Sequence, residues 1–189
     1  AGGRTAVISY SWMSELYSRA PYVSDRDRVQ LDAEGSIQYG MYYWDDNYPD
    51  SHVFAEGECL RKTFDPDFML YHTMAVDEWG HMKGADSAEY ANAVAAVGHL
   101  IAARMPEWLE KGYQVVVTAD HGMNNLGIHV GTEHAQREVA LYIFSDKVEN
   151  GRFEENYISQ LNVAPLVCKL MGVSATEGMK QELEIVFSK

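Results

Sequence analysis

Two short apolar runs, each leading to an aspartate, constrain the fold of this chain more than any other feature. One run covers residues 68–76 and leads to Asp77, and the other covers 114–119 and leads to Asp120. The runs contain no Asp, Glu, Lys or Arg, and their content of Val, Met, Tyr and Phe predicts buried strands of a parallel sheet. A carboxylate at the C-terminal end of such a strand points into the crevice where open α/β sheets bind ligands.

Histidines follow both aspartates at spacings that suit a metal site. His81 lies four residues after Asp77, His121 is adjacent to Asp120, and His129 stands between glycines in G-I-H-V-G. Carboxylate and neutral imidazole bind Zn²⁺ at about 2.0 to 2.2 Å, and three protein ligands with one open position form the catalytic arrangement. We expect Asp77, His81 and His129 to form one complete site, and Asp120 with His121 to form part of a second.

Other residues compete for these roles. His134 lies five residues beyond His129 and is an alternative third ligand. His72 lies inside an expected strand, where a histidine satisfied within the core is the usual case. An acidic, aromatic stretch offers a further candidate cation site, for which a solvated turn is the competing interpretation; its aspartates are Asp45, Asp46 and Asp50.

The motifs resemble the alkaline phosphatase superfamily, and within it the type I phosphodiesterase and nucleotide pyrophosphatase family. The resemblance is carried by V-V-V-T-A-D-H-G-M, by G-I-H-V-G-T-E-H-A-Q-R-E-V-A-L-Y-I-F and by L-N-V-A-P-L-V-C-K-L-M-G-V. It covers most of the chain and implies an α/β fold, with a mostly parallel sheet flanked by helices as in the alkaline phosphatase core. It also matches Asp77, His81 and His129 to one metal site and Asp120 with His121 to part of the other.

Two parts of the family pattern have no match in this chain. The second metal site of the family also needs an Asp from the first strand, and the nucleophile is a Thr or Ser at the start of a nearby helix. We therefore expect a core that is incomplete at the N-terminus, a C-terminal part of a longer catalytic domain, and a nucleophile upstream of this chain. Ser9 and Ser11, at the end of the first expected strand at 5–9, are candidate substitute nucleophiles.

The resemblance implies a metal-dependent hydrolase of small-molecule phosphate esters, of the phosphodiesterase or nucleotide pyrophosphatase type. The complete enzyme is expected to hold two divalent ions, Zn²⁺ or Mn²⁺, and this chain one complete site with weak or no activity alone. A related phosphomonoesterase, phosphonate hydrolase, sulfatase or phosphomutase is an alternative, as is a non-catalytic metal-binding domain.

Composition limits the organisation and the partners. A chain of 189 residues with 47% hydrophobic content suits one domain, 1–189. The polar and aromatic segment 22–62 is interpreted as a cap-like or loop insertion. A net charge of −13 argues against binding a nucleic-acid backbone, and no run approaches the roughly 18 apolar residues of a membrane span. Compartment and oligomeric state have no signal in the sequence.

Local patterns place the remaining elements. Asp86 or Ser87 is expected to cap a long helix with apolar residues at three-and-four spacing. Pro106 predicts a kink or a fresh helix start, and Gly112 predicts its end. A strand is expected at 139–144 and a last helix from about residue 163 to 171.

Overall fold

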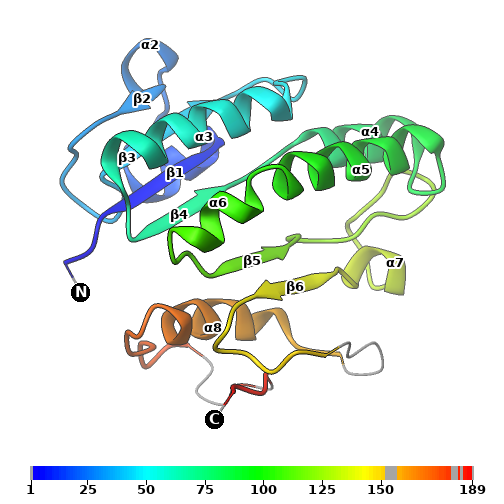
Figure 1. Ribbon diagram of the computed structural model, residues 1–189. Coiled ribbons are helices and arrows are strands. Elements are labelled where there is room, and N and C mark those ends of the chain that lie inside the picture. Colours follow the sequence, from blue (N-terminus) through cyan, green and yellow to red (C-terminus); the bar gives the residue numbers. More distant parts are fainter. Residues whose placement is uncertain (1, 152–156, 180–182, 184, 189) are drawn as a thin grey trace. The chain divides into compact units, whose positions relative to one another are not determined.

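The computed structural model describes residues 2–151, 157–179, 183 and 185–188 of the chain. These residues form two compact units (Figure 1). The first unit comprises Ala1–Ala103 and Gly122–Arg137, and the second comprises Arg104–His121 and Glu138–Lys189. The expectation of one domain over 1–189 stays a prediction.

A four-stranded sheet in the order β2-β3-β1-β4 forms the centre of the first unit. Strand β1 (Thr5–Tyr10) pairs in parallel with β3 (Tyr39–Tyr43) on one side and with β4 (Phe68–Tyr71) on the other. The short edge strand β2 (Val29–Gln30) pairs antiparallel with β3. Four consecutive residues of β1, from Ala6 to Ser9, are buried, as expected for a strand covered on both faces.

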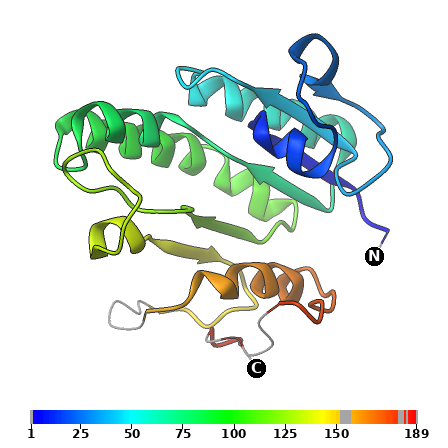
Figure 2. The ribbon, with the colours of Figure 1, turned by 180° about the vertical axis from the view of Figure 1, so that it is seen from behind.

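Helices cover both faces of this sheet. Figures 1 and 2 view it from opposite sides, with α3 (Asp50–Phe64) in front in the first and α1 (Trp12–Tyr17) in front in the second. Val53 of α3 joins the core cluster around Ile8, whereas Met13 of α1 packs against the opposite cluster around Val7. The prediction of an α/β fold with a mostly parallel sheet flanked by helices is confirmed.

Segment 22–62 contains regular structure that the interpretation as a loop insertion missed. It holds a short helix α2 (Ser24–Asp27), the strands β2 and β3, and most of the 15-residue helix α3. The reason is that two aromatic residues of this segment are core residues: Tyr42 and Tyr43 are each 1% exposed, and they face opposite sides of the sheet. The cap-like role of the segment stays a prediction.

The apolar run 68–76 is a strand for only part of its length. Strand β4 ends at Tyr71, and helix α4 (Ala75–Lys83) begins four residues later. Asp77 therefore lies in the first turn of a helix, and the expectation that it ends a strand is wrong. Asp77 and Glu78 in that first turn favour the helix, because acidic side chains interact well with the positive end of a helix dipole.

The second long helix of the first unit begins where the sequence predicts it. Helix α5 (Ala88–Ala102) has Ser87 as its N-cap, and the Ser87 hydroxyl oxygen accepts a hydrogen bond of 3.1 Å from the Tyr90 N–H. A final short helix, α7 (His134–Arg137), completes this unit.

The second unit is built on a two-stranded antiparallel sheet of β5 (Val115–Thr118) and β6 (Leu141–Phe144). Helix α6 (Met105–Glu110) carries Pro106 in its first turn, which confirms the fresh start. A 3-10 turn, η1 (Gln160–Asn162), leads into α8 (Val163–Leu170), whose buried residues include Leu166 and Leu170. In the part of the chain that the structure describes, no helix has the length and hydropathy needed to span a bilayer.

Candidate metal centre

Asp77 and His81 lie one turn apart on the same face of α4. Residues four apart on a helix are neighbours on its surface, and Asp77 Oδ2 is 3.5 Å from His81 Nε2. The two side chains are 30% and 43% exposed, respectively. The helix thus brings a carboxylate oxygen and an imidazole nitrogen together at a surface that solutes can reach.

The hydrogen bond on the other side of the His81 ring assigns its tautomer. His81 Nδ1 is 2.8 Å from the carbonyl oxygen of Gly127. Because a carbonyl oxygen only accepts, Nδ1 carries the proton, and a neutral ring then presents the lone pair of Nε2 toward Asp77. Metal-binding histidines use this arrangement, in which a backbone carbonyl holds the nitrogen that does not bind the ion.

The distance between the two ligand atoms fits a shared cation. A lone pair and a carboxylate oxygen that face each other repel, and a bridging cation removes the repulsion. Two ligand atoms bound at about 2.1 Å lie about 3.4 Å apart across a tetrahedral angle, close to the 3.5 Å between Asp77 Oδ2 and His81 Nε2. The residues present therefore fit a divalent ion with oxygen and nitrogen ligands.

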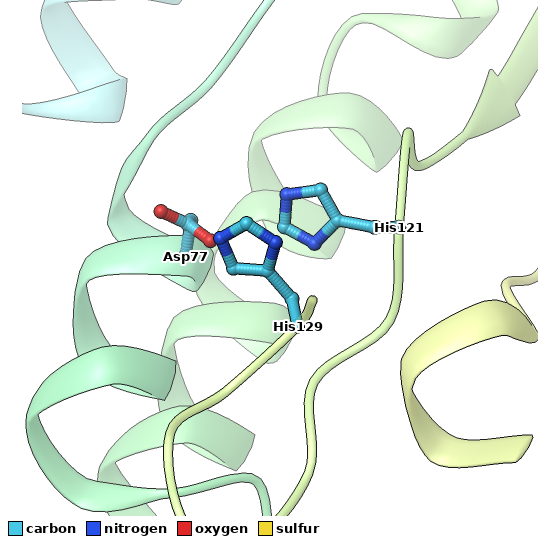
Figure 3. Close-up of side chains that lie close together, drawn as sticks. All are labelled: Asp77, His121 and His129. Atoms are coloured by element: carbon cyan, nitrogen blue, oxygen red, sulfur yellow. The ribbon is translucent and has the colours of Figure 1, made fainter. Parts of the chain in front are cut away.

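His129 approaches the same place from the loop between Gly122 and Thr132. Its ring centroid is 5.0 Å from that of His81, and a ligand atom of His129 lies within 4.8 Å of one of Asp77. Figure 3 shows the Asp77 and His129 side chains pointing toward one another. The first unit thus brings together the three residues expected to form the complete site.

Asn124 holds the loop that carries His129. Its side chain is 8% exposed, and its Oδ1 accepts hydrogen bonds from the backbone N–H groups of Leu126 (3.0 Å) and Ile128 (2.9 Å). The Asn124 N–H in turn donates to the Ile128 carbonyl at 3.1 Å. The buried side-chain amide of Asn124 thus accepts hydrogen bonds from two backbone N–H groups and closes the turn immediately before His129.

Gly127 allows the loop to dock against α4. Its φ is 73°, and a Cβ at this position would lie 2.6 Å from the His81 carbonyl oxygen and 3.0 Å from that of Gly80. Only glycine combines this left-handed conformation with such a close approach. The same contact places the Gly127 carbonyl where the His81 ring donates its hydrogen bond.

Gln136 of α7 closes the loop from the other side, and the sequence reasoning missed it. Its side chain is 5% exposed. Nε2 donates to the Ile128 carbonyl at 3.3 Å, Oε1 accepts from the Glu133 N–H at 3.2 Å, and the backbone carbonyl accepts from the Gly122 N–H at 2.9 Å. The sequence around Gln136 is polar and does not predict that this side chain is buried. Its burial depends on backbone groups of the loop, which come into reach only when the loop folds.

The structure favours His129 over His134 as the third ligand. His134 is exposed and is the first residue of α7. The His129 ring lies beside that of His81, with ring centroids 5.0 Å apart.

Asp120 and His121 follow β5 by two and three residues, so the predicted strand is present, but it pairs antiparallel with β6 and the expected parallel pairing is wrong. Asp120 Oδ2 is 3.6 Å from His121 Nε2, and Asp120 Oδ1 accepts a hydrogen bond of 3.1 Å from the His121 N–H. Gln160 Nε2 donates to the carbonyls of Ala119 (2.9 Å) and Asp120 (3.0 Å). The Asp120 side chain is 68% exposed, more than that of Asp77 or His81, whereas the His121 side chain is 29% exposed.

Met123, which follows His121 by two residues, is held against α4. The buried Met123 packs on that helix, since a Cβ on Gly80 would lie 2.8 Å from the Met123 methyl carbon. His121, also labelled in Figure 3, is two residues before Met123. Two peptide steps separate Cα atoms by at most about 7 Å, so the Cα of His121 lies within that distance of the Cα of Met123.

Two alternatives from the sequence are not supported. Ser9 is fully buried in β1, so it cannot meet a substrate as a substitute nucleophile. Ser11, the N-cap residue of α1, is half-buried, and its role as a substitute nucleophile stays a prediction. Within the described ranges, the aspartates proposed as a further cation site do not converge on one point; they are Asp45, Asp46 and Asp50.

The sequence model of the family described as type I phosphodiesterase / nucleotide pyrophosphatase matches residues 5–165. The chain belongs to this family, which is part of the alkaline phosphatase superfamily.

The chain is also similar in sequence to several GPI ethanolamine phosphate transferases. The chain is 27% identical over 157 residues to the GPI ethanolamine phosphate transferase 3 catalytic subunit of Mus musculus, covering 79% of this chain and 14% of that protein. It is 28% identical over 110 residues to the corresponding Homo sapiens subunit, covering 57% of this chain and 10% of that protein. GPI ethanolamine phosphate transferase 2 of Schizosaccharomyces pombe is 23% identical over 132 residues, which cover 59% of this chain and 17% of that protein. The chain thus spans less than a fifth of the length of these relatives, and no solved structure matches it.

Proposed function

We propose that this chain is part of a metal-dependent enzyme that cleaves or transfers phosphate esters. The observation that carries the proposal is the 3.5 Å distance between the Asp77 carboxylate and His81 Nε2, beside His129. Membership of the type I phosphodiesterase / nucleotide pyrophosphatase family supports the reaction class. Both lines rest on different evidence, one on geometry and the other on sequence similarity.

Asp77, His81 and His129 would hold one divalent ion, with Zn²⁺ or Mn²⁺ as the candidates that oxygen and imidazole ligands suit. Such an ion supplies positive charge to phosphate oxygens and lowers the pKa of a bound hydroxyl or water. Asp120 and His121 would contribute two ligands of a second ion in the complete enzyme. Because the expected Thr or Ser nucleophile has no match in this sequence, we propose weak or no turnover by the chain alone.

The family description and the names of the relatives point to different reactions, hydrolysis and transfer. The family description favours hydrolysis of a phosphodiester or pyrophosphate, in which water accepts the phosphoryl group. The matched relatives are named ethanolamine phosphate transferases, which favours an ethanolamine phosphate group passing to an acceptor hydroxyl. We propose hydrolysis as the first candidate and this transfer as the second, with a small phosphate ester as the substrate in both.

Metal analysis tests the shared part of the two candidates. We expect the purified chain to bind about one Zn²⁺ per molecule in calorimetric titration, because three protein ligands are a complete catalytic set. His129→Ala should abolish this binding, and His134→Ala serves as the matched control that leaves it intact. A chain that binds no divalent ion would contradict the proposal.

Product analysis separates the candidates. A form of the protein that contains the nucleophile segment is incubated with bis-p-nitrophenyl phosphate, with and without a chelator and with added alcohols as acceptors. Formation of p-nitrophenol with p-nitrophenyl phosphate supports hydrolysis, whereas formation of p-nitrophenol with an alkyl p-nitrophenyl phosphate diester supports transfer to the added alcohol. A rate that survives chelation would overturn the metal-dependent mechanism in either form.

A further inference from the structure

The strongest unexplained feature of the first unit is a buried carboxylate at the start of α3. Asp50 is the first residue of that helix and is 8% exposed. Its Oδ1 lies 3.2 Å from the backbone nitrogen of Met74 and 3.4 Å from that of Ala75, both N–H groups donating to the carboxylate. These donors are 24 and 25 residues away in sequence and form the start of α4.

Helix α4 needs an acceptor at this end. The first N–H groups of a helix have no partner within it, and Met74, the N-cap residue of α4, supplies no side-chain cap. Asp50 provides the missing acceptor from another helix, and its negative charge suits the positive end of the α4 dipole.

The surroundings of Asp50 show why its carboxylate depends on the two N–H donors of α4. The carboxylate lines a cavity of about 700 Å³ whose walls include the apolar residues Ala75, Ala93 and Leu100. Burial raises the pKa of Asp50, while the hydrogen bonds from Met74 and Ala75 act in the opposite direction. A carboxylate that is 8% exposed depends on such donors, because burial removes most of its contact with water.

Asp50 acts on the opposite side of α4 from the candidate metal ligands. Ala75 and Trp79 line the cavity beside Asp50, whereas Asp77 and His81 meet each other. Two residues along a helix turn the side chain by about 200°, so the cavity and the ligand pair occupy different faces. Asp50 therefore reaches the ligands only through the helix itself.

We infer that Asp50 is a positioning residue, which fixes the N-terminal end of α4 and thereby aligns Asp77 and His81 for a metal ion. The C-terminal half of the same helix is held by the approach of Gly127 to the carbonyls of Gly80 and His81. Helix α4 is thus anchored at both ends by residues distant in sequence. The inference rests on the proposed function for its link to the metal, but the hold on α4 is a property of the chain alone.

Hydrogen exchange of the metal-free chain tests that hold. In Asp50→Ala, the amides at the start of α4 should exchange about tenfold faster relative to those of β1, because two donors lose their acceptor. Asp50→Asn should restore the protection, since its amide oxygen still accepts. Leu60→Ala is the matched control: it truncates a fully buried side chain further along the same helix and should leave α4 exchange at the level of β1.

Titration with Zn²⁺ tests the link to the ligands. Asp50→Ala should weaken binding about tenfold, at the lower end of the effect of groups that orient metal ligands, while Asp50→Asn and Leu60→Ala bind within about twofold of the unaltered chain. If Asp50→Ala does not fold, Asp50→Ser is the second truncation, because its hydroxyl is too short to reach Met74.

The outcomes are separable. Unchanged α4 exchange in the truncated variant overturns the inference whether or not the chain binds metal. Faster exchange with unchanged Zn²⁺ affinity also overturns it, because the helix would then not align the ligands. Absence of Zn²⁺ binding by the unaltered chain refutes the proposed function, and the link to metal with it, while the exchange data still decide whether Asp50 holds α4.

Discussion

The two halves of the predicted metal centre differ in how the chain holds them. In the first unit, Asp77 and His81 are fixed on a helix, and the loop of His129 is closed by the buried amides of Asn124 and Gln136. In the second unit, Asp120 follows the end of β5 with its side chain 68% exposed, and its carboxylate interacts with the neighbouring His121.

This difference shows that the chemical identity of the ligands and their preorganisation in the fold are separate properties. All five residues have side chains that suit Zn²⁺, yet the first set is held by hydrogen bonds that are already made. An ion bound there loses little free energy to ordering its ligands. The second set needs additional ligands before it gains the same advantage, so the two sets should respond differently to substitution.

The largest expected contrast is between ligand deletions in the two sets. Asp77→Ala and His81→Ala should each weaken Zn²⁺ binding by more than about 100-fold, because loss of a direct ligand exceeds the 10- to 100-fold cost of losing an outer partner. His121→Ala should change the affinity by less than about threefold. Calorimetric titration measures all three. An equal loss in His121→Ala would break the comparison and assign His121 to the same ion.

A smaller effect is expected when the loop is pushed away from α4. Gly127→Ala adds a Cβ 2.6 Å from the His81 carbonyl at a φ of 73°. Gly112→Ala is the control, since it has a similar φ of 85° and nothing within 4 Å. The left-handed conformation costs both variants about 1 kcal/mol, and the clash should add about 1 to 3 kcal/mol in Gly127→Ala alone.

Urea unfolding gives the two free energies, and Zn²⁺ titration of the same proteins gives the functional effect. We expect weaker metal binding only in Gly127→Ala, because the displaced carbonyl no longer orients the His81 ring. Equal stability losses in the two variants would show that the loop adapts and that the docking is not tight.

Sequence reasoning succeeded where a local signal decides the structure. Ser87 caps α5 through a bond to a residue three positions later, and Pro106 starts α6. Both outcomes depend on a few adjacent residues, so a short window contains the cause. The identities of the candidate ligands came from motifs of the same short range.

It failed where the cause lies far along the chain. The run 68–76 has strand-like composition throughout, but a helix begins at Ala75 with an acceptor from Asp50. The aromatic residues of β3 read as a loop because their acidic neighbours are solvated, whereas Tyr42 and Tyr43 fill the core on both faces of the sheet. Gln136 is a further case, since its burial depends on a loop that closes only in the folded unit.

The smallest expected effect concerns the turn that precedes His129. Asn124→Ala removes the acceptor of the Leu126 and Ile128 N–H groups and should destabilise the first unit by about 1 to 2 kcal/mol. Its neighbour Asn125 is exposed, so Asn125→Ala should stay within about 0.5 kcal/mol of the unaltered chain. If preorganisation of the loop is what separates the two ligand sets, Asn124→Ala should also weaken Zn²⁺ binding, by several-fold, while all direct ligands remain. Unchanged affinity together with the lost stability would mean that the ion itself orders the loop, and the contrast between the two sets would then lie in ligand number alone.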